Sequence, residues 1–282
     1  MEGNREEIMK LLEEMAIANS SKQDILKIKN LLLKYNKGFR LAKEKEFNKA
    51  QSVFLNADIV LHYQFKEGSF EYYFIQLFAI SSKSYLEFKM NNKEQAIVLT
   101  KKGIEYSILL QEYQSSHNIM GVFISQMLEN LAKIHLLSKE TKDWYDITLE
   151  NIHFLLNFSR PRNCQDFDIS RFKKTPLQLR YSKLISVLND VLINITKFKV
   201  TNGQKLIESI IINDKSDPII TLIDSWVELN VCINKQHTQT DVFNTTYNNF
   251  LESEHNNYDL QNLKLFLEYR IKEEGIQLYE VV

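Results

Sequence analysis

Proline and glycine are scarce along this chain, and that scarcity limits the folds it can adopt more than any other feature. Its 282 residues contain 3 prolines and 7 glycines. A large β-sandwich or barrel needs frequent turns and draws on both residue types to make them. Apolar residues also recur at steps of three and four over most of the chain, which is typical of amphipathic helices. The sequence therefore predicts an all-α protein of about 11–12 helices joined mostly by short turns.

The longest interruption of this helical pattern lies at Ser159–Thr175. It contains Pro161, is rich in polar and charged residues, and is followed by Pro176. Such a composition favours a loop. The sequence therefore predicts three parts: helices with a leading helix in 1–158, a loop in 159–175, and further helices with a capping helix in 176–282.

The charge balance and the cysteines bear on partners and compartment. The chain carries 35 basic and 36 acidic residues, whereas nucleic-acid-binding proteins usually have a basic excess. No stretch approaches the ~20 apolar residues of a membrane span, and the N-terminus does not resemble a signal peptide. Cys164 and Cys232 form no motif and are expected to be two unpaired structural thiols, as in a reducing compartment. We therefore expect a cytoplasmic protein that binds neither nucleic acid nor a membrane.

Small residues recur at fixed spacing within successive predicted helix pairs. Gly38, Ala50 and Ala57 are followed 46 residues later by Ser84, Ala96 and Gly103, and Phe54 adds an aromatic residue to the first set. Small side chains let two antiparallel helices approach closely, and an aromatic ring can fill the gap to the next pair. One pair cannot bury its apolar face alone, so several must stack.

Two later segments continue the pattern less regularly. Ala132 begins a third unit, in which Trp144 stands where a small residue is expected, and a fourth unit closes on Asp217-Pro218. The second helix of that fourth unit is expected to contain Leu206, Ile210 and Asn213. The units follow one another at 46, 48 and 62 residues.

This pattern resembles the tetratricopeptide repeat over about Leu31–Pro218. The resemblance implies a right-handed superhelix of antiparallel helix pairs, an α-α solenoid. The alternative is an irregular helical bundle in which the small residues coincide by chance.

The resemblance also implies a concave groove lined by the first helix of each pair. Asparagine and glutamine amides there would hold an extended peptide backbone, and lysines would favour an acidic peptide or a carboxylate. Alternatively, the aromatic residues belong to the core and the lysines are solvated. The expected groove residues are Tyr35, Asn36, Phe39, Lys43, Phe78, Tyr85, Phe88, Lys89, Gln126, Glu129, Asn130, Lys133, Phe198 and Lys199.

Two Glu-x-x-His pairs, Glu150/His153 and Glu252/His255, are the sharpest metal-site motif in the sequence. Paired motifs of this kind build di-iron sites in four-helix bundles. Glu150 and His153, however, point away from the apolar face that Trp144 marks on their helix. The other histidines, His117 and His135 among them, are spaced too widely to share an ion. We therefore expect no metal and no cofactor.

Nucleophile and phosphate-binding motifs are also absent from the sequence. We therefore expect a non-enzymatic adaptor or sensor that binds a protein or peptide. Two alternatives remain: a helical enzyme or enzyme subunit with a site, possibly metal-containing, in a bundle core, and a homo-oligomeric scaffold.

Overall fold

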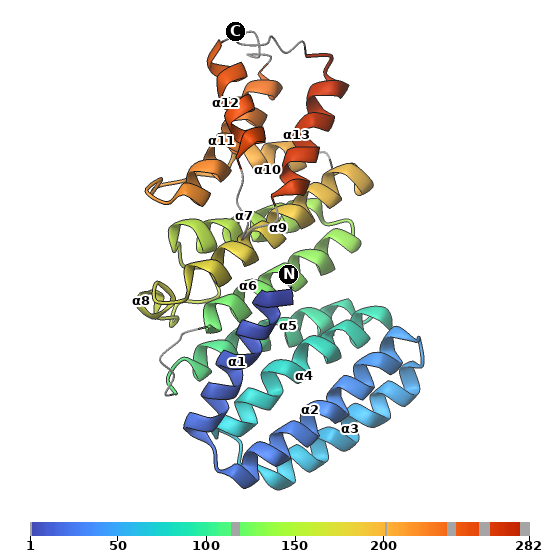
Figure 1. Ribbon diagram of the computed structural model, residues 1–282. Coiled ribbons are helices and arrows are strands. Elements are labelled where there is room, and N and C mark those ends of the chain that lie inside the picture. Colours follow the sequence, from blue (N-terminus) through green and yellow to red (C-terminus); the bar gives the residue numbers. More distant parts are fainter. Residues whose placement is uncertain (1, 114–118, 201, 236–240, 254–259, 277–282) are drawn as a thin grey trace. The chain divides into compact units, whose positions relative to one another are not determined.

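The chain is helical throughout the computed structural model, which describes residues 2–113, 119–200, 202–235, 241–253 and 260–276. These residues form thirteen helices and no strand, which confirms the all-α prediction (Figure 1). No helix among them combines the length and the apolar content needed to cross a bilayer. The helices are α1 (Glu2–Asn19), α2 (Lys22–Lys43), α3 (Phe47–Gln64), α4 (Phe70–Lys89), α5 (Lys93–Leu110), α6 (Met120–Leu137), α7 (Thr141–Asn157), α8 (Ile169–Phe172), α9 (Leu177–Phe198), α10 (Gly203–Glu208), α11 (Pro218–Asn234), α12 (Asp241–Glu252) and α13 (Gln261–Glu273).

The chain divides into two compact units. The N-terminal unit comprises Glu2–Glu140 and Arg160–Pro176, and the C-terminal unit comprises Thr141–Ser159 and Leu177–Val282. The sequence placed α7 with the helices that precede it and read residues 159–175 as a separate loop. In the structure α7 belongs to the C-terminal unit, and most of the loop belongs to the N-terminal unit.

The loop joins the N-terminal unit because it is packed and hydrogen-bonded there. Phe167 and Phe172 are completely buried. The side chain of Gln111 donates to the carbonyl of Asp166 at 2.9 Å and accepts from the backbone N–H of Asp168 at 2.8 Å. The polar composition of this segment thus conceals two aromatic anchors and the short helix α8.

The same turn follows α2, α4 and α6. Its central residue has a positive φ each time, 64° at Lys45, 65° at Asn91 and 65° at Lys139. The next residue donates its backbone N–H to the carbonyl five positions earlier at 2.9 Å, as in a Schellman motif. These turns are 46 and 48 residues apart, which is the spacing of the small residues. The recurrence is compatible with a helical repeat.

Small side chains lie where the helices of the N-terminal unit cross. Helices α2 and α3 pack together, as do α4 and α5, and α4 also packs against α2 (Figure 1). Ala50 and Ala57 are completely buried on α3. A Cβ at Gly38 would come within 2.4 Å of the Phe54 ring. In the second pair, the buried hydroxyl of Ser84 donates to the carbonyl of Ala96 at 2.9 Å.

The C-terminal unit has a core around Trp226, which is completely buried and donates from its indole N–H to the carbonyl of Leu263 at 3.1 Å. Helix α11 packs against α10, α12 and α13, and α9 packs against α7, α10 and α13. Helix α10 ends at Glu208, so it is shorter than the predicted helix, which continued to Asn213. The fourth predicted repeat therefore lacks a full second helix.

Candidate functional site

A groove lies among α2, α4 and α6 of the N-terminal unit and encloses about 410 Å³. Its residues recur at steps of three and four along α4 and α6, so each helix presents one face to it. The lining residues are Phe39, Ser81, Ser84, Tyr85, Phe88, Lys89, Gln126, Asn130, Lys133, Ile134 and Leu137. The structure thus brings together seven of the predicted groove residues: Phe39, Tyr85, Phe88, Lys89, Gln126, Asn130 and Lys133.

One position of the recurring pattern supplies a lining residue from each of the three helices. Phe39, Tyr85 and Lys133 each follow the small residue that begins a unit, and they are 46 and 48 residues apart. Because the turns recur at the same spacing, these three side chains leave their helices in equivalent directions. The groove is therefore aromatic at its α2 and α4 positions and cationic at the α6 position.

The aromatic part of the groove carries two lysines. The rings of Phe39 and Tyr85 meet edge to face, with centroids 5.3 Å apart. The Lys43 ammonium lies 4.4 Å from the Phe39 centroid, and the Lys89 ammonium lies 5.5 Å from the Tyr85 centroid. Both distances are within the range of cation–π attraction. Neither lysine forms an ion pair with another described residue, so both charges remain available to an anionic ligand.

The α6 part of the groove is hydrogen-bonded along its own helix. The amide of Gln126 donates to the side-chain oxygen of Asn130 at 3.3 Å. The Lys133 ammonium pairs with the Glu129 carboxylate at 2.8 Å. Glu129 is buried, so it orients Lys133 from beneath and does not line the groove. An incoming carboxylate would thus compete with Glu129 for this lysine.

The remaining predicted residues lie outside the groove lining. Tyr35 is buried between α2 and α3, because its position on α2 faces the helix pair. Asn36 is exposed on α2, and Lys43 is exposed beside Phe39. Phe78 packs edge to face on Phe123, with centroids 5.5 Å apart. Lys199 is exposed in the C-terminal unit, in the turn after α9, and the side chain of Phe198 lies outside the described part of the structure.

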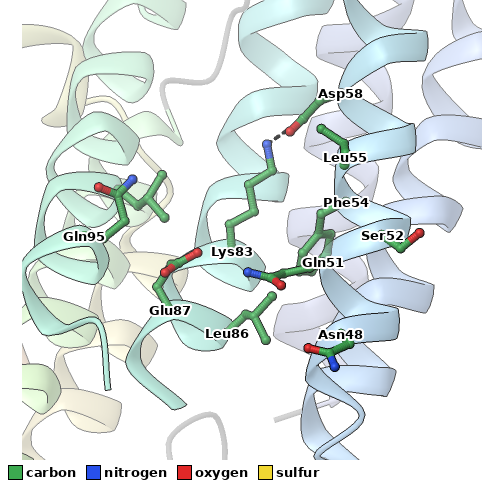
Figure 2. A pocket seen from close by; sticks show the side chains of 11 residues that line it. Asn48, Gln51, Ser52, Phe54, Leu55, Asp58, Lys83, Leu86, Glu87 and Gln95 are labelled. Carbon is green, nitrogen blue, oxygen red and sulfur yellow. Dashed lines mark hydrogen bonds and ion pairs between the residues drawn. The ribbon is translucent and has the colours of Figure 1, made fainter. Parts of the chain in front are cut away.

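A second cavity, of about 580 Å³, lies among α3, α4 and α5 and was not predicted (Figure 2). The Asp58 carboxylate on its wall accepts a hydrogen bond from the Tyr35 hydroxyl at 2.6 Å and pairs with the Lys83 ammonium at 2.5 Å. Burial and this neighbouring carboxylate raise the pKa of Tyr35 far above its usual value. The cluster joins three helices, and no local sequence signal could reveal it because its members are 23 and 25 residues apart from Asp58.

Polar side chains surround this α3–α5 cavity, whereas its deepest residues are apolar. Figure 2 shows Asn48 and Gln51 on α3 and Gln95 on α5 around Leu86. Leu86 is buried, whereas the three amides are exposed. The two basic and acidic groups within reach of one another, Lys83 and Asp58, already satisfy each other, so the cavity offers no unpaired charge at its floor.

The histidines do not assemble the metal site that was considered and rejected from the sequence. The Nε2 atom of His153 accepts from the backbone N–H of Ile211 at 3.2 Å, so it serves as a backbone acceptor. Burial lowers the pKa of His153, which favours the neutral ring that can accept this bond. His135 pairs with Glu140 at 2.7 Å. His117 and His255 lie outside the described residues.

No family model, no curated protein and no solved structure matches this chain. The groove and the α3–α5 cavity thus have no counterpart from which a ligand could be transferred. Their own chemistry therefore has to carry the assignment of function.

Proposed function

We propose that the chain is a non-enzymatic, repeat-based binding protein that holds an extended peptide segment of another protein in the groove among α2, α4 and α6. The observation that carries the proposal is the convergence of three equivalent positions, Phe39, Tyr85 and Lys133, on one groove. Repeats that stack in a superhelix place equivalent residues along a continuous inner surface, which suits a linear ligand.

The lining chemistry supports a peptide in preference to a compact metabolite. Gln126 and Asn130 present amides, which can donate to and accept from an extended peptide backbone. The rings of Phe39 and Tyr85 offer flat apolar contacts that lose little conformational freedom on binding. Lys43 and Lys89 beside these rings favour carboxylates on the ligand.

An array of random short peptides tests the proposal, with the full chain compared with its Tyr85→Ala and Asn130→Ala variants. Asn48→Ala, in the α3–α5 cavity, is the matched control because it also truncates an amide beside a cavity. We expect peptides selected by the wild type to bind at least about tenfold more weakly to both groove variants, and unchanged to the control. Circular dichroism verifies that the variants stay folded.

Selected peptides that bind both groove variants as tightly as the wild type would refute the assignment of the groove. Their acidic content is a second readout. Replacing their glutamates and aspartates by amides should weaken binding, and the loss should shrink at high salt because exposed charges are screened.

A further inference from the structure

Helix α2 carries an unusual concentration of positive charge. It contains seven basic residues and one acidic residue, whereas the whole chain has 35 and 36. Lys22, Lys34, Lys37 and Arg40 are exposed, and none of these four forms an ion pair with another described residue. Their charges are therefore not neutralised within the part of the chain that the structure describes.

Two leucines are exposed among these basic residues. Leu26 and Leu33 keep 64% and 65% of their surface in contact with solvent, and they stand seven residues apart. Seven residues are nearly two helical turns, so both leucines lie on the same side of α2. We call the surface formed by Lys22, Leu26, Leu33, Lys34, Lys37 and Arg40 the basic edge.

The basic edge is a different face of α2 from the one that lines the groove. At 100° per residue, Leu26, Leu33 and Arg40 are opposite the buried face, which Leu31, Tyr35 and Ala42 define. Phe39, the one α2 residue in the groove, lies between these two faces. From Lys22 to Arg40 the basic edge extends about 27 Å, which is the length of five turns of a partner helix.

We propose that the basic edge docks an acidic amphipathic helix of a partner protein. Glutamates or aspartates of that helix would pair with the four unneutralised cations. Apolar residues one heptad apart would pack on Leu26 and Leu33, as side chains do along a helix–helix seam. This surface is separate from the peptide groove, so the proposal does not depend on the function proposed for the groove.

The leucines decide between this partner and other anions. Nucleic acid would engage the cations through phosphates and leave two aliphatic side chains in water without a base to stack on. An anionic membrane requires an apolar face free to enter the lipid, whereas the apolar face of α2 is packed against α3 and α4. A protein helix satisfies the cations and the leucines together.

The test uses the full chain and a designed, fluorescently labelled helical peptide, followed by fluorescence anisotropy. The peptide has leucines seven residues apart with glutamates on both sides of them. A first control peptide replaces the glutamates by glutamines, and a second replaces the leucines by serines. We expect binding of the designed peptide that weakens at least about tenfold with either control peptide.

The protein variants separate the basic edge from general charge. Lys34→Gln combined with Lys37→Gln and Arg40→Gln should weaken binding at least about tenfold, and so should Leu26→Ser combined with Leu33→Ser. Lys101→Gln combined with Lys102→Gln removes exposed charge from α5 and should have no effect. None of the substituted side chains is buried, so the fold is retained.

Three results would overturn the proposal. The first is undiminished binding to the charge or leucine variant, and the second is an equal loss with the α5 control. The third is tighter binding of duplex DNA, or of phosphatidylserine vesicles, than of the designed peptide. Retained peptide binding in the Tyr85→Ala variant is expected, so failure at the basic edge and failure at the groove are distinguishable.

Discussion

Replacing Gly38 by alanine tests whether the close crossing of α2 and α3 depends on a missing side chain. A Cβ built at Gly38 meets three atoms of the Phe54 ring, at 2.4, 2.7 and 3.0 Å. Ordinary contacts of a Cβ begin at 3.4 Å, so the ring and its helix must separate by about 1 Å. Phe54 is only 4% exposed and stacks on the Tyr35 ring, so it cannot swing into solvent.

Two effects of opposite sign set the magnitude. Alanine in the middle of a helix is more stable than glycine by about 1 kcal/mol. Overpacking a well-filled core costs about 1–3 kcal/mol, and this substitution belongs in the upper part of that range because the obstacle is a buried aromatic ring. The net expectation is a loss of about 1–2 kcal/mol in the free energy of unfolding. For a chain of this size that corresponds to a fall in melting temperature of about 2–8 °C.

Urea denaturation followed by far-ultraviolet circular dichroism measures this change. Asn36→Ala, on the exposed side of the same helix, is the matched control and should be neutral or slightly stabilising. A shorter side chain opposite Gly38 should relieve the strain, so Gly38→Ala should cost less in the Phe54→Leu background than in the wild type. A Gly38→Ala variant as stable as the wild type, or more stable, would refute the reasoning.

Three further substitutions have expected outcomes that urea denaturation can measure. Asp58→Asn should lower the free energy of unfolding by about 1–3 kcal/mol, because two donors lose a charged acceptor, and by less in the Lys83→Met background; equal losses would contradict the pairing. Trp226→Phe should cost about 1–3 kcal/mol because it leaves a buried carbonyl of α13 without a donor, and an unchanged stability would contradict that bond. Burial lowers the pKa of His153 from its ordinary 6.5, so below about pH 6.5 the unfolded chain binds the proton more readily and the wild type loses stability as the pH falls. The stability advantage of the wild type over His153→Gln should therefore narrow between about pH 7.5 and 5.5, and a constant difference would contradict this linkage.

The parts of the fold that could be predicted from sequence have local causes. Ser21 and Ser69 accept hydrogen bonds from the backbone N–H groups of Asp24 and Tyr72, so they cap α2 and α4. The spacing of small residues predicted which helices approach each other closely, because a side chain at Gly38 would be excluded sterically. The same spacing led to the groove residues on α4 and α6, since equivalent positions leave equivalent helices in the same direction.

The parts that could not be predicted depend on contacts between distant residues. Tyr35 was expected in the groove, but it faces Asp58 on α3, 23 residues away. The polar segment after α7 was read as a loop between two parts, but Phe167 and Phe172 bury it in the N-terminal unit. In both cases the local pattern is the same whether the side chain is buried or exposed, and only its tertiary partner decides.

Four consecutive residues of α2 show how one helix can support two separate binding surfaces. Lys37 and Arg40 lie on the basic edge, Gly38 lies against α3, and Phe39 lines the groove. Each step of 100° thus assigns the next residue to another environment. The buried position keeps α2 in register with α3, and that register fixes the direction of the other three. Substitutions at exposed positions can therefore remove one binding surface and leave the other intact, whereas a change at Gly38 would disturb both.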